Sequence, residues 1–402
     1  MSEPRLLSRN LLAYLASRFC AASAMTMLRA GIAWHVFALT NSPFHLGLIG
    51  LAQFGPAFSL MLVGGAAADA FDRRRIMMVA QSVALVAACV LFVTESRGIL
   101  GLPLLYGVVM VVAATGAFDS PARASILPTL VKRDSFPRAV TIASTNQALA
   151  FATGPAIAGV IIAAAGPATV YAAYAVLIAG SIGGLFLLRP VTASPGRTAI
   201  GVRAVVEGLT FVRRRQVVLG CMALDMLAVI FGGATALLPI YANDILHVGP
   251  RGYGLLSSSL ELGALATSLV LVMTPPIRHA GRALLIAVMA YGLATVTFGL
   301  SRWFPLSIVA YMLVGVADQV SVVMRSTIVQ LSTPDELRGR VSAINMMFIN
   351  ASNQLGAAES GFLAALTSAP FAVVSGGAAS VVVAALVAYL LPQLRRYRFD
   401  RA

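Results

Sequence analysis

Ionisable side chains interrupt several long apolar runs of this sequence. They are Arg18, Arg29, Asp119, Asp225, Glu261, Asp318 and Glu359. A charge near the centre of a bilayer costs about 2.5–3.5 kcal/mol on insertion scales, so a charged residue in a membrane segment marks a candidate functional site. Such groups can bind and release protons, or bind a charged solute.

Three carboxylates are the candidates for proton coupling. Glu359 is the first, because it lies deep in the stretch 339–366, where hydrocarbon disfavours the ionised form and favours proton exchange near neutral pH. Glu261 is the second for the same reason. Asp225 is the third, because Arg18 could keep it ionised. The alternative is that Glu359 pairs with a polar neighbour and only stabilises the protein.

The elements that would hold these side chains are membrane-spanning helices. The chain has 402 residues, of which 59% are hydrophobic and 11% charged, whereas soluble proteins average about 25% charged residues. Twelve helices of about 20 residues would use roughly 240 residues and leave little for a soluble domain. The net charge of +14 does not indicate a nucleic-acid partner, because the arginines form short clusters between apolar runs.

The apolar runs fall into two groups of six. The first group covers residues 11–39, 44–68, 76–94, 100–122, 139–164 and 168–188. The second group covers residues 216–242, 252–273, 283–300, 304–326, 339–366 and 371–392. We predict an all-α membrane protein with twelve transmembrane helices in two pseudo-symmetric six-helix bundles. The predicted domains are an N-terminal bundle at 1–188, a cytoplasmic linker at 189–215, and a C-terminal bundle with a short basic tail at 216–402.

Basic residues fall mainly on one side of this arrangement. If both termini are cytoplasmic, the inside loops hold arginine clusters such as 73–75 and 213–215, whereas only Arg97, Arg251 and Arg302 lie outside. Cytoplasmic loops carry an excess of Lys and Arg. We therefore predict a multi-pass protein of the bacterial inner membrane with both termini in the cytoplasm.

The two groups of helices resemble each other. Pro43 recurs as Pro250 at an offset of 207 residues. The segment Gly-Ala-Phe-Asp at 116–119 recurs as Gly-Val-Ala-Asp at 315–318, at an offset of 199. Parallel repeats of this kind place a binding site between two halves near the middle of the membrane.

The repeat predicts which side chains border such a cavity. Arg18 and Asp225 are 207 residues apart, so we expect them at equivalent positions of helices one and seven. The candidate cavity residues are Arg18, Arg29, Asp225, Asp318, Gln147 and Asn350. The alternative is that each charge pairs within its own half and only stabilises the fold.

A glycine-rich and arginine-rich loop joins the second and third runs. Residues 64–75 read Gly-Gly-Ala-Ala-Ala-Asp-Ala-Phe-Asp-Arg-Arg-Arg. This segment resembles the loop signature of the major facilitator superfamily, although Ala70 stands where a basic residue is usual. The resemblance implies a charge lock that is made and broken as the two halves rock. The candidate gating residues are Asp69, Arg73, Arg74, Arg75, Asp119, Arg123, Arg338 and Arg340. The alternative is a basic cytoplasmic loop with an incidental aspartate.

The fifth run contains Gly154, Pro155 and Gly159 in the order Gly-Pro-Ala-Ile-Ala-Gly. This order resembles a Gly-Pro-x-x-Gly-Gly signature of antiporters, with alanine at two of the glycine positions. Small residues allow close helix packing, and proline removes a backbone hydrogen bond so that the helix can bend. The alternative is an ordinary packing face of small residues.

The most specific segment is Thr-Pro-Asp-Glu-Leu-Arg-Gly-Arg-Val at 333–341. It resembles the loop before helix eleven in the enterobactin-exporter and macrolide-efflux branch of bacterial exporters. The segments 121–131 and 237–256 resemble the same branch, so the likeness spans nearly the whole chain. One feature is missing: drug–proton antiporters often carry an arginine in the middle of helix four, and residues 102–118 contain none.

The resemblance implies a secondary active transporter that exports a small organic solute, such as a siderophore or a drug-like compound, by proton antiport. An importer or facilitator of the same fold is the alternative, and a membrane-embedded enzyme is favoured less. We expect no enzymatic activity, cofactor, metal or nucleic acid, and we expect a monomer whose partners are solute, protons and lipid. The cysteines have no paired spacing, and His35 and His45 are interpreted as interfacial side chains.

Overall fold

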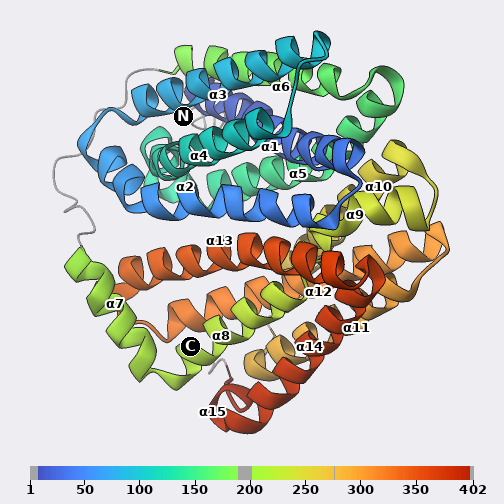
Figure 1. Cartoon of the computed structure of the whole chain (residues 1–402). Coiled ribbons are helices and arrows are strands. Elements are labelled where there is room, and N and C mark those ends of the chain that lie inside the picture. Colours follow the sequence, from blue (N-terminus) through green and yellow to red (C-terminus); the bar gives the residue numbers. More distant parts are fainter. Residues whose placement is uncertain (1–7, 189–201, 276, 399–402) are drawn as a thin grey trace. The chain divides into compact units, whose positions relative to one another are not determined.

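The computed structural model describes residues 8–188, 202–275 and 277–398, which form helices joined by short loops (Figure 1). The side chains of residues 62, 69, 133 and 202–206 are not described. The predicted gating residue Asp69 is therefore placed only as a backbone position in a helix. Residues 189–201 of the predicted linker lie outside the described residues.

The chain divides into two compact units, of which the first contains residues 1–36 and 52–199. Its helices are α1 (Arg9–Thr40), α2 (Pro43–Ala70), α3 (Arg73–Ser96), α4 (Leu102–Leu130), α5 (Phe136–Ala165) and α6 (Pro167–Phe186). The end of α1 and the start of α2, residues 37–51, belong to the second unit. Within the first unit α3 packs against α4 and α6.

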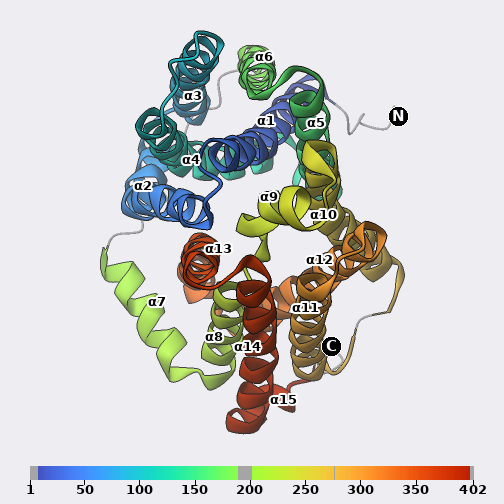
Figure 2. The same ribbon diagram turned by 45° about the vertical axis from the view of Figure 1, so that its right-hand side comes forward.

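The second unit continues from residue 200 to the C-terminus. Its longer helices are α7 (Val202–Arg214), α8 (Gln216–Phe231), α10 (Gly249–Met273), α11 (Ala280–Leu300), α12 (Phe304–Leu331), α13 (Asp335–Leu366) and α14 (Ala369–Leu390), followed by the short α15 (Pro392–Arg395). Here α11 packs against α12 and α14 (Figure 2). This arrangement repeats that of α3 with α4 and α6, as the sequence repeat predicts.

Eleven stretches of the described chain are long and apolar enough to cross a membrane. They correspond to eleven of the twelve predicted runs. The twelfth run is α13, whose 32 residues also exceed the length that a bilayer requires. This helix is more polar than the others, because it carries Asn345, Asn350, Asn353, Gln354 and Glu359.

The surface of α3 shows how a helix of this protein meets lipid. Val79, Val83, Val86, Val90 and Val93 are all exposed, and their spacing of three and four residues places them on one face of the helix. A contiguous exposed apolar stripe is unfavourable in water. It is the expected outer surface of a helix in hydrocarbon.

The seventh run is interrupted by a pair of glycines. The helix α8 ends at Phe231, and Gly232 and Gly233 separate it from the 3-10 turn η2 (Ala234–Leu237), α9 (Leu238–Ile240) and the π-turn η3 (Tyr241–Ile245). Two glycines favour a break because each destabilises a helix interior by about 1 kcal/mol. Apolar composition alone does not predict this interruption.

Glycines also set two equivalent helix crossings. Gly64 of α2 lies directly against the Ala117 carbonyl of α4, and Gly263 of α10 lies against the Met312 carbonyl of α12. The two glycines are separated by 199 residues, which is one of the repeat offsets. Gly65, the next residue of α2, has open space where a side chain would project.

The helix α7 lies in the segment that the sequence identifies only as a polar linker. Arg340 of α13 forms an ion pair with Glu207 of α7 at 2.6 Å. Gly208 lies close to the Ile344 side chain. Basic side chains end this helix at Arg213 and Arg214. The helix α7 is therefore held by a polar and an apolar contact against the first turns of α13, the end that we predict to face the cytoplasm.

Candidate functional site

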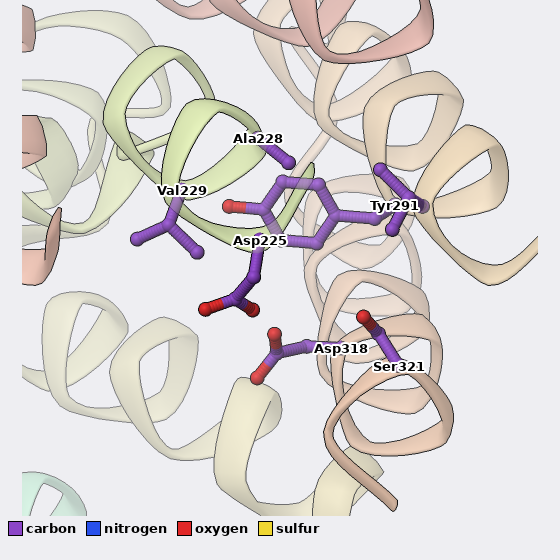
Figure 3. A pocket seen from close by; sticks show the side chains of 7 residues that line it. Asp225, Ala228, Val229, Tyr291, Asp318 and Ser321 are labelled. Carbon is purple, nitrogen blue, oxygen red and sulfur yellow. The ribbon is translucent and has the colours of Figure 1, made fainter. Parts of the chain in front are cut away.

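Two aspartates face a small cavity in the second unit. Asp225 of α8 and Asp318 of α12 line a cavity of about 10 Å³, which is room for about one water molecule, together with Tyr291 of α11 and Ser321 of α12. Figure 3 shows both carboxylates turned into this space. Tyr291 donates a hydrogen bond of 2.9 Å to the Gly232 carbonyl. The glycine break after α8 thus provides the acceptor that fixes the tyrosine ring at the cavity.

Arg325 of α12 supplies the positive charge of this site. Its side chain is 2% exposed, and its Nη2 lies 3.2 Å from Oδ1 of Asp225. Its Nη1 donates to Oδ1 of Asn345 at 3.1 Å, whereas its Nε has no hydrogen-bond partner within the described chain. Because Arg325 follows Asp318 by two helical turns, both side chains come from one face of α12.

The charge balance of this cluster bears on what it can do. The charges that act on the Asp318 carboxyl group are those of Asp225, Arg325 and Glu261. One guanidinium therefore faces more than one carboxylate in a buried site. Surplus negative charge away from water is unfavourable, and binding of a proton to one carboxylate removes it. The arrangement is suited to reversible protonation.

The three predicted coupling residues lie in different surroundings. Asp225 forms the buried ion pair, and Glu261 of α10 is half-buried within electrostatic reach of Asp318. Glu359 of α13 is half-buried, does not line the cavity, and accepts a hydrogen bond of 3.3 Å from Ser360. Asp318 lines the cavity although it is not among the three predicted coupling residues; its only signal in the sequence is the repeat that relates it to Asp119.

Arg18 forms a second polar cluster, within the first unit. Its Nη1 donates to the Tyr14 hydroxyl at 3.0 Å, and its Nη2 donates to Oε1 of Gln147 on α5. The Tyr14 hydroxyl in turn donates to the Arg123 carbonyl at 3.2 Å. Arg18 is half-buried, its Nε has no partner, and no carboxylate of the described chain lies within ion-pair distance of it. Within the described chain its hydrogen-bond partners are therefore neutral groups.

The other predicted cavity residues are differently placed. Gln147 is the partner of Arg18. Arg29 of α1 and Asn350 of α13 are exposed on their own units. Their predicted roles stay predictions.

Asp119 and Arg123 form an ion pair on α4. Nε of Arg123 lies 2.9 Å from Oδ2 of Asp119, and its Nη2 donates to Oδ1 at 3.1 Å. Gln81 of α3 donates to the same Oδ1 at 2.8 Å. The Gln81–Asp119 hydrogen bond therefore fastens α3 to α4, and the buried Arg123 holds the Asp119 carboxylate in place.

The arginine triplet at the start of α3 binds mostly backbone oxygens. Nη1 of Arg73 donates to the Ser125 carbonyl at 2.8 Å, and Nη2 of Arg74 donates to the Phe186 carbonyl at 3.1 Å. Arg75 is exposed and lies 3.9 Å from Asp72. The first two arginines tie α3 to the last turns of α4 and α6, where partial negative charge accumulates.

In the second unit the predicted gating arginines pair with acids. Arg338 lies 2.6 Å from Asp335 on the same helix, and both side chains are exposed. Arg340 pairs with Glu207 of α7. Neither pair lines the cavity around Asp225.

The antiporter-like residues of α5 form a helix contact. Gly154 lies directly against Thr26 and the Ser23 carbonyl of α1. Pro155 and Gly159 are buried in the same helix. Close packing of small residues between α1 and α5 is therefore what this segment provides.

His35, interpreted from the sequence as an interfacial side chain, is buried within the first unit near the end of α3. Its side chain is 4% exposed, its Nδ1 lies 2.7 Å from the Tyr171 hydroxyl of α6, and its Nε2 lies 3.4 Å from Oε1 of Glu95 on α3. Glu95 follows directly after the apolar run 76–94, so it was not recognised as a membrane carboxylate. His45 is half-buried.

Comparisons with known proteins agree with this architecture. The profile of a family described as transmembrane secretion effector, MFS_3, matches residues 11–399. The chain therefore belongs to this family of major facilitator transporters, and it is a multi-pass membrane protein. It is 23% identical over 388 residues to enterobactin exporters of Escherichia coli and Escherichia fergusonii, covering 95% of this chain and 92% of each relative.

Solved structures show the same fold at low identity. A POT family transporter in complex with a thioalcohol-conjugated peptide matches with a TM-score of 0.74 and 12% identity, covering 96% of both chains. A bacterial homologue of the human lysosomal transporter Spinster matches with a TM-score of 0.70 and 15% identity over the full length of both. The nucleoside transporter NupG matches with a TM-score of 0.75 and 11% identity, covering 95% of this chain and 100% of that one.

Proposed function

We propose that this protein exports a small organic solute from the bacterial cytoplasm in exchange for protons. The observation that carries the proposal is the relationship to enterobactin exporters over nearly the full length of both chains. Both termini lie in the cytoplasm, because that orientation places the arginine clusters inside. The two units alternate access to a site near the middle of the membrane, and the protein works as a monomer.

The solute carries anionic oxygen atoms, as a siderophore or an acidic drug-like compound does. Arg18 supports this proposal, because within the described chain its half-buried guanidinium is held only by the neutral partners Tyr14 and Gln147. Guanidinium groups bind carboxylate and phosphate oxygens with two parallel hydrogen bonds. A ligand oxygen would satisfy the Nε atom that has no partner in the described chain.

Protons bind in the cavity between Asp225 and Asp318. One proton shared between the two aspartates, with the charged Arg325 beside them, balances the charge of these three groups, and its release leaves a surplus carboxylate. Glu261 is a second proton carrier, because its charge acts on Asp318. Glu359 remains the carboxylate that the sequence favours, and it is tested separately.

The ion pairs at the helix ends form the gates. Asp119 with Arg123 fastens α3 to α4, and Arg340 with Glu207 fastens α13 to α7. Asp69 and Arg338 belong to the same proposed set. Ion pairs that form in one state and open in the other bias a two-state transition by their differential contacts.

The direction of transport is tested by comparing a deletion strain with the same strain carrying the gene. Small acidic metabolites are quantified inside the cells and in the medium, and susceptibility to acidic drugs is measured in parallel. Export predicts a metabolite that leaves the complemented cells and accumulates inside the deleted ones. The alternative, an importer or facilitator of the same fold, predicts depletion of that compound from the medium by complemented cells.

A further inference from the structure

A hollow lined by basic side chains lies at one end of the second unit. Its volume is about 350 Å³, and its described lining consists of His279, Arg282, Arg395, Arg396 and Arg398. No acidic side chain belongs to that described lining. This volume falls within the range of small-molecule sites, about 300–1,000 Å³.

The fold holds the C-terminal arginines at this place. The Gly281 backbone N–H, at the start of α11, donates to the Tyr397 carbonyl at 3.3 Å. Gly281 also lies directly against the Leu394 carbonyl, and Leu394 is fully buried. Ser332, directly after α12, donates to the Tyr397 hydroxyl at 3.2 Å. Arg395, Arg396 and Arg398 are therefore positioned by contacts with two neighbouring segments.

The chemistry of the hollow suits a phosphate-bearing anion. Each guanidinium presents five N–H donors in a planar fork that matches phosphate oxygens. The first turn of α11 begins between His279 and Arg282, and the start of a helix adds a partial positive charge. Four arginines within one hollow exceed what a topology signal requires, because that signal needs basic residues near the membrane but no common site.

Apolar surface beside the hollow indicates that the anion belongs to a lipid. Ile286 is 65% exposed one turn beyond Arg282 on α11, and Tyr389 is 81% exposed at the end of α14. These two helices pack against each other in the second unit. A headgroup in the hollow could thus extend its acyl chains along exposed apolar faces. Basic pockets between transmembrane helices bind anionic headgroups in this way.

We propose that this hollow binds the phosphate headgroup of an anionic membrane phospholipid. The site depends neither on the transport direction nor on the coupling residues proposed above. A bound lipid would link the C-terminal tail to α11 and α12 and stabilise the second unit.

The experiment measures lipid binding to the purified full-length protein by native mass spectrometry in detergent. The probes are cardiolipin, phosphatidylglycerol, phosphatidylcholine and inorganic phosphate. The test variant is R395Q/R396Q/R398Q, and the matched control is R213Q/R214Q/R215Q, which removes the same charge from exposed positions at the end of α7 and the start of α8. Lipid binding is also measured for the charge-preserving variant R395K/R396K/R398K and for Arg282→Gln. These two variants keep the proposal testable if the triple glutamine variant does not fold.

We expect the wild type to bind the two anionic lipids at least about tenfold more tightly than phosphatidylcholine, because each basic residue near an anionic headgroup contributes about 1 kcal/mol. The triple glutamine variant should lose this preference, and Arg282→Gln should reduce it, whereas the control and the lysine variant should keep most of it. Equal binding of all lipids by the wild type would overturn the proposal. So would an equal loss in test and control variants, or displacement of the lipid by millimolar inorganic phosphate, which would indicate a site for free anions.

Discussion

Arg325 has a structural role that can be separated from transport. Its guanidinium is buried, pairs with Asp225 at 3.2 Å and binds Asn345 at 3.1 Å. Loss of one partner from a buried ion pair leaves an uncompensated charge, which destabilises proteins by about 3–5 kcal/mol. Loss of both charges together leaves no unpaired charge at these two positions, while the Asp318 carboxyl group stays in the cavity.

We therefore expect Arg325→Gln to lower the thermal stability of the purified protein markedly. The double variant D225N/R325Q should recover most of the loss, because its buried amides carry no charge. The midpoint of thermal unfolding in detergent measures both effects. An Arg325→Gln protein as stable as the wild type would mean that this ion pair does not hold α8 to α12.

Asp318, which lines the cavity, and Glu359, which the sequence indicates, are two candidates for the proton-coupling carboxylate, and their variants should behave differently. Asp318→Asn removes a protonatable group from the cavity, so it should exchange solute at equilibrium but fail to concentrate it under a pH gradient. Glu359→Gln should still concentrate solute, because Glu359 is half-buried outside the cavity, and within the described chain its carboxylate accepts a hydrogen bond only from Ser360.

Both variants are assayed in proteoliposomes with the metabolite identified by the secretion comparison. Protein insertion and equilibrium exchange serve as controls for folding. If Asp318→Asn concentrated solute normally under a pH gradient and Glu359→Gln did not, Glu359 and not Asp318 would be the coupling residue.

Among the helices, close contacts at small residues decide how each unit packs. Gly64 of α2 lies directly against the Ala117 backbone carbonyl, so a side chain at this position has no flexible neighbour to displace. Gly65 is its neighbour in the same helix and faces open space. Both substitutions by alanine improve intrinsic helix propensity by the same amount.

Gly64→Ala should therefore destabilise the first unit by about 1–3 kcal/mol, which is the usual consequence of overpacking. Gly65→Ala should be neutral or slightly stabilising. Thermal unfolding of the two purified variants gives the comparison. If Gly64→Ala were as stable as Gly65→Ala, α2 and α4 could move apart at this crossing without loss of stability.

Over the whole molecule, the repeat and the arginine distribution define a topology. The N-terminal and C-terminal halves each contribute six long apolar segments, so both termini should lie on the same side of the membrane. A phosphatase reporter, which is active only in the periplasm, should be inactive after Ala402 and active after Gly98, in the loop between α3 and α4. Activity after Ala402 would reverse the orientation.

How much of this protein the sequence predicts depends on the kind of feature. Apolar run length predicts the helices, because a bilayer imposes a fixed length of about 20 residues. The break at Gly232 was missed, since the run 216–242 stays apolar through it. The side-chain partners of the buried ionisable residues were predicted poorly. Asp225 pairs with Arg325 of the same unit, where the sequence suggested Arg18, and His35 contacts Glu95 and Tyr171. These pairs join segments far apart in the chain, and no local pattern records them.

The central claim is proton-driven export, and solute accumulation in everted membrane vesicles tests it most directly. In such vesicles the periplasmic face points inward, so export appears as uptake into an acidified interior. If one proton exchanges for one molecule of the anionic solute while the membrane potential is held at zero, a gradient of one pH unit supplies about 1.4 kcal/mol, enough for about tenfold accumulation. We predict that wild-type vesicles concentrate the identified metabolite and lose it when the pH gradient is collapsed. Accumulation that ignores the gradient, or that occurs only when the vesicle exterior is made acidic, would contradict proton-driven export.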